Sequence, residues 1–268
     1  MNHSISFDQL TFGEKIGEFN HVVRGKWNGK QVVTKKYLAA TEKVEREYRE
    51  LKNANHENII FLYGISYHNE FVYFVMEYMD GGSLHDLIHC QKQIKYDQAH
   101  VINWALQCAR ALAYMHAQTP QVVHRDLSPQ NMFLKNRRME LKISDFTYVR
   151  KIATKMTSNI PTPIAYKAPQ YINGSTFTDK CDVYSWDIAM WEMLSRKTPF
   201  ANLSDLEICK RVTKGERPSF DELEIQCTQG IKQLMTACWS PDPNERYSMQ
   251  KIVADLEKLP IIVDQLGL

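Results

Sequence analysis

Residues 124–131 of the chain read His-Arg-Asp-Leu-Ser-Pro-Gln-Asn, and an Asp-Phe pair follows at Asp145 and Phe146. This stretch supplies three side chains whose oxygens suit phosphoryl transfer. The carboxylate of Asp126 can accept or orient the proton of an attacking hydroxyl. The oxygens of Asn131 and Asp145 are of the kind that hold Mg²⁺. A lone His-Arg-Asp tripeptide would indicate little, but this order and spacing together predict a site for phosphoryl transfer.

From end to end the chain resembles a eukaryotic protein kinase domain. Its sequence is most similar to the transforming-growth-factor-β-activated kinases, a group of MAP kinase kinase kinases in the tyrosine-kinase-like branch. The likeness rests on residues 75–78 (VMEY), 81–84 (GGSL), 180–186 (KCDVYSW) and 238–243 (CWSPDP). The resemblance implies an α+β, bilobal protein kinase fold, with a small β-rich N-lobe that contains one helix and a larger, mainly helical C-lobe.

The resemblance also implies the domain boundaries. We expect one protein kinase domain over residues 7–260, with the N-lobe at about 7–79 and the C-lobe at 80–260. Residues 1–6 and 261–268 would be short terminal extensions. A chain of 268 residues is longer than most single domains but suits a domain of two lobes.

Local patterns predict several elements. Two β-branched runs, 22–23 and 32–34, flank the Asn28-Gly29 turn and predict a hairpin. Residues 41–53 are rich in helix formers, with Thr41 as the N-cap. Residues 71–79 predict a strand that leads into a linker. Helices are predicted over 98–117 and 182–194, each with one apolar stripe that faces the core.

Composition excludes other classes of protein. Lys and Arg total 33 against 31 Asp and Glu, a net charge of +2, which gives no electrostatic case for a nucleic-acid or membrane partner. The six cysteines show no metal-ligand spacing and there is no signal peptide, so we expect reduced thiols and a cytoplasmic location. No apolar run is long enough to span a bilayer.

The resemblance implies a catalytic set of five residues. Lys35 would neutralise charge on the α- and β-phosphates of ATP, with Glu47 on the predicted helix as its ion-pair partner. Asp126 would be the catalytic base. Asn131 and Asp145 would hold Mg²⁺, so ATP and Mg²⁺ are the expected cofactors.

The same resemblance places the adenine slot. The backbone carbonyl of Glu77 and the backbone amide of Met79 would contact adenine, and Met76 would be the gatekeeper at the back of the slot. The complete predicted nucleotide-binding set is Ile16, Gly17, Glu18, Val22, Val33, Lys35, Met76, Glu77, Met79 and Phe133.

The glycine-rich loop departs from the family pattern. The family writes Gly-x-Gly-x-x-Gly, whereas this loop keeps only Gly17 and is two residues shorter. The bulky residues 19–21 argue against close approach of backbone amides to phosphates, and Glu18 adds a negative charge. We therefore expect weakened nucleotide affinity.

Three further departures concern single residues. Ser128 replaces the lysine that serine/threonine kinases carry in the catalytic loop. The γ-phosphate therefore loses a positively charged partner and keeps at most a neutral hydrogen bond. Thr147 replaces the glycine after Asp-Phe; it costs stability if the backbone there needs positive φ, and otherwise only stiffens the segment. Gln170 replaces the glutamate that pairs with an arginine, here Arg246, so we expect a hydrogen bond without charge and a looser activation segment.

Other residues receive structural or regulatory roles by resemblance. His124 would pack against Phe146, and Asp182 would be structural. Thr154 and Thr157 match threonines whose phosphorylation activates the similar kinases. A phosphate there could pair with Arg125 and with an arginine at position 150.

Two functions remain open on the sequence. The first is an ATP- and Mg²⁺-dependent serine/threonine protein kinase, similar to MAP kinase kinase kinases and with reduced activity. The second is a pseudokinase that acts as a scaffold, decoy or allosteric partner in a MAP kinase pathway, which the four departures together motivate. Expected partners are protein substrates of the MAP kinase kinase class and an activating adaptor protein, with no nucleic acid and no membrane insertion.

Overall fold

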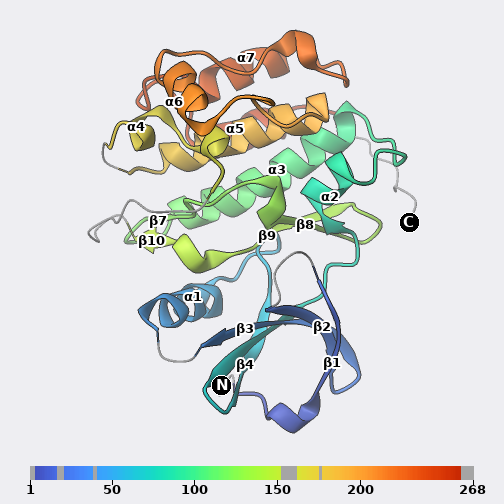
Figure 1. The fold of residues 1–268 in the computed structure, drawn as a ribbon. Coiled ribbons are helices and arrows are strands. Elements are labelled where there is room, and N and C mark those ends of the chain that lie inside the picture. The colour runs from blue at the N-terminus through green and yellow to red at the C-terminus, as the bar shows by residue number, and fades with distance from the viewer. Residues whose placement is uncertain (1–3, 17–20, 39–40, 152–161, 175–176, 261–268) are drawn as a thin grey trace.

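The computed structural model describes residues 4–16, 21–38, 41–151, 162–174 and 177–260. Two lobes are evident in Figure 1: strands and one helix form the lower part, and helices dominate the upper part. This arrangement confirms the predicted α+β bilobal fold.

The N-lobe contains a five-stranded antiparallel sheet in the order β1-β2-β3-β5-β4. The predicted hairpin is present, because Asn28 and Gly29 adopt φ values of 48° and 81° between β2 and β3. Two successive positive φ values are typical of the tight turn that matches strand twist. The strands are β1 (Leu10–Lys15), β2 (Val22–Trp27), β3 (Lys30–Leu38), β4 (Leu62–His68) and β5 (Phe71–Glu77).

Helix α1 (Glu42–Asn53) begins as predicted. The Thr41 side chain accepts a hydrogen bond from the backbone N–H of Val44, which satisfies one of the free donors of the first turn. The helix buries Val44, Glu47 and Leu51. Since Glu47 is on this buried stripe, α1 carries a carboxylate into the interior of the molecule.

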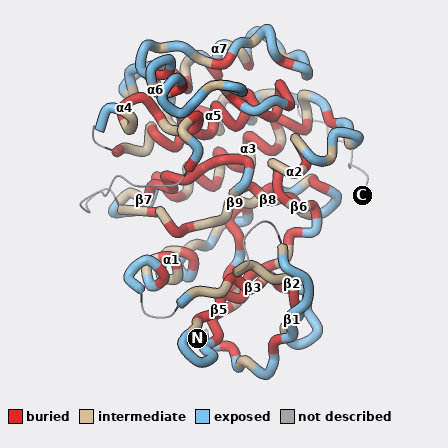
Figure 2. The backbone as a smooth tube through the Cα atoms, in the orientation of Figure 1, coloured by how far each residue is buried: buried red, intermediate tan, exposed pale blue. Residues whose placement is uncertain are grey.

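The C-lobe is built around α3 (Gln98–His116) and α5 (Lys180–Ser195). Figure 2 shows both as the buried centre of the lobe. The stripe predicted on α3 is confirmed, and Asp97 with His100 forms a capping box at its start. The remaining helices are α2 (Leu84–His89), α4 (Pro169–Ile172), α6 (Asp205–Thr213), α7 (Gln229–Cys238) and α8 (Met249–Leu256).

The stripe predicted on α5 is buried as expected, but burial extends beyond it, because every residue from Cys181 to Ser195 is buried. The sequence pattern could not reveal this, since the helix carries polar residues on several sides. Asp187 is the most unusual of them: it is completely buried, and neither carboxyl oxygen has a hydrogen-bond partner among the residues that the structure describes. Burial raises the pKa of Asp187 well above its ordinary value, against the opposing charges of Arg217 and Arg246.

Replacing Asp187 with alanine is expected to stabilise the chain at neutral pH by about 1–3 kcal/mol, because it removes a buried polar group without partners. The raised pKa means that the folded state favours the neutral acid, so the native chain loses stability as pH rises above the ordinary aspartate value. Urea unfolding at pH 4.5 and pH 7.5 measures the effect, with Asp187→Asn as the control that removes the charge and keeps the polarity. An unchanged or lowered stability of both variants at pH 7.5 would contradict the assignment.

Two small sheets are formed by short strands outside the five-stranded sheet. One joins β6 (Gly82–Ser83), β8 (Met132–Lys135) and β9 (Glu140–Ile143), and the other pairs β7 (Val122–Val123) with β10 (Arg150–Lys151). The backbone N–H of Ile60 donates to the carbonyl of Ile143 at 3.0 Å, and the N–H of Ile143 donates to the carbonyl of Asn58 at 2.9 Å. These bonds fix the segment before β4 against β9.

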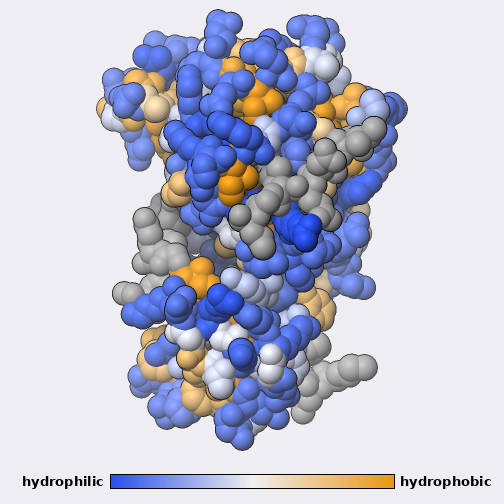
Figure 3. Space-filling model, turned by 90° about the vertical axis from the view of Figure 1, so that its right-hand side faces the viewer, coloured by the Kyte–Doolittle hydropathy of each residue, from blue (hydrophilic) through white to orange (hydrophobic). Residues whose placement is uncertain are grey.

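The surface has no dominant apolar face in the view of Figure 3, where hydrophilic residues surround separate small hydrophobic areas. In the part of the chain that the structure describes, none of the helices combines the length and apolar character needed to cross a bilayer.

Candidate active site

The structure brings Lys35, Glu47 and Asp145 together. The Lys35 Nζ atom lies 3.1 Å from Glu47 Oε1 and 3.3 Å from Asp145 Oδ1. The predicted ion pair is therefore formed, between residues on β3 and α1. Lys35 is 9% exposed and Glu47 is 1% exposed, so the pair lies in a region where charges interact strongly.

The pKa values reflect this arrangement. Burial alone would lower the pKa of Lys35, but Glu47 and Asp145 outweigh it and raise the value. Burial alone would raise the pKa of Asp145, but Lys35 and the hydrogen bonds from Thr147 outweigh it and lower the value. Lys35 and Asp145 therefore remain charged at neutral pH.

Asp126 and Asn131 lie next to each other in the loop between β7 and β8. Asn131 Nδ2 donates to the backbone carbonyl of Asp126 at 2.7 Å. Burial raises the pKa of Asp126, and the charge of Asp145 adds to the increase against hydrogen bonds from Thr162 and Asn131. Its Oδ1 atom accepts a hydrogen bond from the Thr162 hydroxyl. No local pattern indicates that contact, because 36 residues separate the two positions.

Asp182 anchors the start of the same loop from α5. Its Oδ2 atom accepts from the backbone N–H of His124 at 2.8 Å and lies 2.9 Å from His116 Nε2, while Oδ1 accepts from the N–H of Arg125 at 2.8 Å. Arg125 has a φ of 72°, which a non-glycine residue adopts only when its surroundings impose it. The His124 ring packs edge-on against Phe146 with centroids 5.5 Å apart, as predicted.

The predicted hinge follows β5. Met76 is buried and pairs with Val33 across the sheet. The Glu77 carboxylate accepts from the backbone N–H of Phe61 at 2.7 Å and from Lys142 at 2.6 Å, and Lys135 lies 3.4 Å away. The sequence did not reveal these lysine contacts, which join the hinge to β8 and β9.

The other predicted nucleotide-binding residues are distributed around this hinge. Met79 is buried, and Val22, Val33 and Phe133 are partly exposed on β2, β3 and β8. The N–H of Ile16 donates to the carbonyl of Val22 at 3.0 Å, which closes the base of the glycine-rich loop. Gly17 and Glu18 lie outside the described residues.

The backbone of Thr147 has ordinary negative φ, so of the two alternatives open on the sequence the one without a cost in stability holds. It lies in a 3-10 helix over Phe146–Tyr148, and positive φ is found instead at Asp145, with a value of 62°. The threonine is therefore unstrained. Its hydroxyl donates to Glu47 Oε2 at 2.7 Å, and Lys35 Nζ donates to that hydroxyl at 3.4 Å. Sequence reasoning treated this residue as a defect and missed these contacts.

Ser128 and Gln170 occupy the positions of two other departures. Ser128 is 2% exposed, and its carbonyl accepts from the N–H of Asn131 at 2.9 Å, so the loop keeps a regular turn without the lysine. Gln170 Oε1 accepts from Arg246 Nη2 at 3.0 Å, which confirms the predicted hydrogen bond. That the activation segment is looser stays a prediction.

Changing Gln170 to glutamate is expected to stabilise the chain by about 1 kcal/mol, because a carboxylate would give Arg246 a charge-assisted bond. Burial lowers the pKa of Arg246 to about 10, and the charge of Asp242 offsets this only in part. The glutamate variant loses the hydrogen bond from Gln170 Nε2 to Cys181 Sγ, but a bond to sulfur is weaker than the bond gained with Arg246. Thermal unfolding should show a rise of about 2–3 °C, Gln170→Ala should show a fall, and a fall for both would refute the argument.

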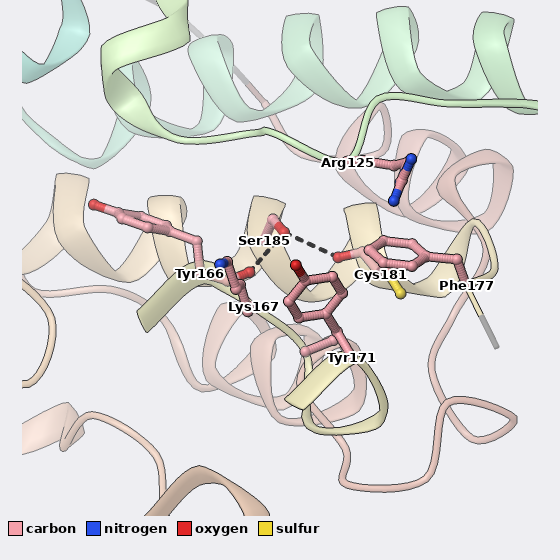
Figure 4. A pocket seen from close by; sticks show the side chains of 8 residues that line it. Arg125, Tyr166, Lys167, Tyr171, Phe177, Cys181 and Ser185 are labelled. Carbon is pink, nitrogen blue, oxygen red and sulfur yellow. Dashed lines mark hydrogen bonds between the residues drawn. The ribbon is translucent and has the colours of Figure 1, made fainter. Parts of the chain in front are cut away.

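A small pocket is lined in part by residues 166–168, near the end of the activation segment (147–170), and Figure 4 shows its lining. The guanidinium of Arg125 lies 4.3 Å above the Phe177 ring, and Ser185 donates to the carbonyls of Tyr166 and Cys181. The lining residues are Arg125, Tyr166, Lys167, Ala168, Tyr171, Phe177, Cys181 and Ser185.

Arg46, Arg125 and Arg150 form a cationic group near the start of the activation segment. Burial, together with the positive charges of Arg46 and Arg125, lowers the pKa of Arg150 to about 10. Mutual repulsion of this kind is relieved by an anion. Thr154 and Thr157, the predicted phosphorylation sites, lie outside the described residues.

Asn131 and Asp145 fit Mg²⁺. The Asn131 amide donates through Nδ2 to the Asp126 carbonyl, which leaves Oδ1 as the atom suited to a metal. The Asp145 side chain is 32% exposed, and its lowered pKa keeps it ionised. Mg²⁺ commonly takes one or two protein oxygens and completes its shell with phosphates and water.

Comparison with known proteins agrees with this geometry. The profile of the family "Protein tyrosine and serine/threonine kinase" matches residues 10–256. Mitogen-activated protein kinase kinase kinase 7 of Drosophila melanogaster is 40% identical over 261 residues, which cover 95% of this chain and 38% of that protein. The human protein of that name is 37% identical, with 93% of this chain and 41% of that protein covered. A putative Drosophila mitogen-activated protein kinase kinase kinase 7-like protein is 35% identical, with 94% of this chain and 67% of that protein covered.

The chain belongs to the protein tyrosine and serine/threonine kinase family. Within that family its sequence is similar to that of mitogen-activated protein kinase kinase kinase 7 from fly and human, which confirms the predicted resemblance. It spans about two fifths of the length of the fly and human kinases of that name. These relatives do not favour the pseudokinase alternative.

Proposed function

We propose that the chain transfers the γ-phosphate of ATP to serine or threonine hydroxyls of protein substrates. The observation that carries the proposal is the assembled Lys35–Glu47 pair beside Asp145, within a family of protein kinases. Phosphoryl transfer depends mainly on positioning and electrostatic stabilisation, and this network supplies both without the missing catalytic-loop lysine.

Each predicted residue has a role in this reaction. The Lys35 ammonium binds oxygens of the α- and β-phosphates, and Glu47 keeps it in place. Asp126 orients the substrate hydroxyl and takes its proton; the hydroxyl replaces Thr162 at Oδ1 or uses the other oxygen. Asn131 and Asp145 hold Mg²⁺, which supplies charge to the phosphates.

The adenine of ATP is held at the hinge. The Glu77 carbonyl and the Met79 amide bind the edge of the ring, while Val22 and Val33 from the N-lobe and Phe133 from the C-lobe cover its faces. Ile16, Gly17 and Glu18 complete the slot beside the phosphates. The shortened glycine-rich loop lowers nucleotide affinity.

The proposed substrates are protein kinases of the MAP kinase kinase class, since the relatives are named mitogen-activated protein kinase kinase kinases. An adaptor protein activates the chain. Phosphate on Thr154 or Thr157 pairs with Arg125 and Arg150, and the cationic repulsion there supports this proposal.

Intact-mass spectrometry after incubation with Mg²⁺-ATP tests the proposal. Phosphate gained by the native chain and not by Asp126→Asn, mapped to Thr154 or Thr157, is the expected result. If neither protein gains phosphate, and neither labels a generic protein substrate at millimolar ATP, the proposed activity is wrong. The pseudokinase role would then be the one to pursue.

A further inference from the structure

The Thr147 hydroxyl bonds the carboxylate oxygen of Glu47 that Lys35 does not contact, and the proposed function assigns no role to this bond. The two oxygens of the Glu47 carboxylate have different partners: Oε1 accepts from Lys35 at 3.1 Å, and Oε2 accepts from the Thr147 hydroxyl at 2.7 Å. Glu47 and Thr147 are 1% and 4% exposed, so water does not compete for these bonds. A glycine at position 147 would leave Oε2 buried without this donor.

The backbone of Thr147 makes two more bonds to the same network. Its N–H donates to Asp145 Oδ1 at 3.2 Å, and its carbonyl accepts from Arg46 Nη2 at 3.3 Å. One residue thus contacts Asp145, Glu47 and the helix that carries Glu47. Because the backbone bonds hold Thr147 in a regular 3-10 helix, its hydroxyl needs no further ordering to reach Oε2.

We propose that Thr147 is a positioning residue that holds α1 against the segment 146–148 and so keeps Glu47 on Lys35. The proposal deepens the proposed function and rests on it for its kinetic part. A helix that swings outward would carry Glu47 away from Lys35. The neutral hydroxyl of Thr147 opposes that movement through its bond to Oε2, and it also accepts a longer hydrogen bond from the Lys35 ammonium at 3.4 Å. The residue that departs from the family pattern is therefore a support of the catalytic assembly.

The isosteric variant Thr147→Val removes only the hydroxyl. It is expected to lower kcat by about tenfold to a hundredfold, because the short bond to the buried carboxylate of Glu47 and the longer bond from Lys35 are both lost. The KM for ATP should change less than about threefold, because Thr147 binds no part of the nucleotide. Thr147→Ser should restore kcat, and Thr147→Gly should behave like the valine variant.

Tyr148→Phe is the matched control. It removes another bond between the same segment and α1, the one from Lys43 to the Tyr148 hydroxyl, and leaves Glu47 unaltered. This variant should keep kcat within about twofold, because that bond is exposed and contributes little. An equal loss in Tyr148→Phe and Thr147→Val would show that general attachment of α1 matters and would overturn the specific role of Thr147.

Hydrogen–deuterium exchange separates this inference from the proposed function. In Thr147→Val without nucleotide, faster exchange should be confined to residues 42–53, and Thr147→Ser should restore the slow exchange. If the native chain transfers no phosphate but this pattern is found, the kinase proposal fails and the positioning role stands. Native exchange in α1 of the valine variant, or native kcat, would overturn the positioning role.

Discussion

Lys35→Met is expected to lower kcat/KM for phosphate transfer by about a thousandfold. Methionine preserves the length of the side chain and removes the charge, so the phosphates lose a cation and the carboxylates of Glu47 and Asp145 lose their shared partner. Steady-state kinetics with a generic protein substrate, together with thermal shift by Mg²⁺-ATP, measure the loss in turnover and in binding.

Lys36→Met is the matched control, because the neighbouring lysine points to the other side of β3. Its Nζ atom lies 3.6 Å from the centroid of the Phe71 ring, an interaction that methionine can partly replace. Activity of Lys36→Met should stay within about twofold of the native value. A Lys35→Met variant that remains as active as this control would exclude the proposed phosphate contact.

The charged network also sets the pH range in which the site is intact. Because the pKa of Lys35 is raised, its contribution to stability is complete below the ordinary lysine value and is lost as pH rises through the raised one. Because the pKa of Asp145 is lowered, its contribution is present above the ordinary aspartate value and is lost as pH falls through the lowered one. Both contributions are therefore complete at neutral pH, where the assays are made.

Asp182→Asn is expected to lower the free energy of unfolding by about 3–5 kcal/mol, as loss of one partner of a buried charged group does. The carboxylate receives two backbone N–H groups and faces His116, so the amide NH₂ of asparagine would meet an N–H donor in either orientation. The positive φ of Arg125 would lose the bonds that hold it, and Asp126 would move with it.

Urea unfolding and kinetics of the same preparation measure this effect. Asp205→Asn changes an exposed aspartate in the first turn of α6 and should cost less than about 1 kcal/mol. The pKa of Asp182 lies below its ordinary value, since burial is outweighed by the hydrogen bond and charge of His116. Its stabilising effect is therefore lost in acid, and the difference between native chain and variant should shrink toward pH 3. Equal stability of the two variants at pH 7 would contradict the anchoring role.

Much of the fold could be predicted because its signals are local. The Asn28-Gly29 turn, the Thr41 cap and the period of the α3 stripe each depend on a few neighbouring residues. The pairing of Lys35 with Glu47 was predicted from a resemblance, since a separation of twelve residues alone carries no information.

The missed features depend on contacts between distant positions. The Thr147–Glu47 bond joins residues 100 positions apart, and the Lys142–Glu77 pair joins residues 65 positions apart. The burial of Asp187 has another cause: the apolar stripe on α5 indicated one buried face, whereas packing on every side of the helix also buries this carboxyl. By the family pattern, threonine in place of glycine at position 147 indicates a loss of backbone freedom. Only the structure shows that its hydroxyl bonds Glu47.

The Glu77 carboxylate makes the hinge sensitive to ionic strength. It receives the Phe61 N–H from the N-lobe and the ammonium groups of Lys142 and Lys135 from the C-lobe, so any opening of the cleft must stretch ion pairs. Lys135 is 35% exposed at its side chain, and dissolved salt screens such a pair more than it screens the buried Lys142. The stiffness of the connection between the two lobes is thereby linked to the salt content of the surroundings, through the single carboxylate of Glu77.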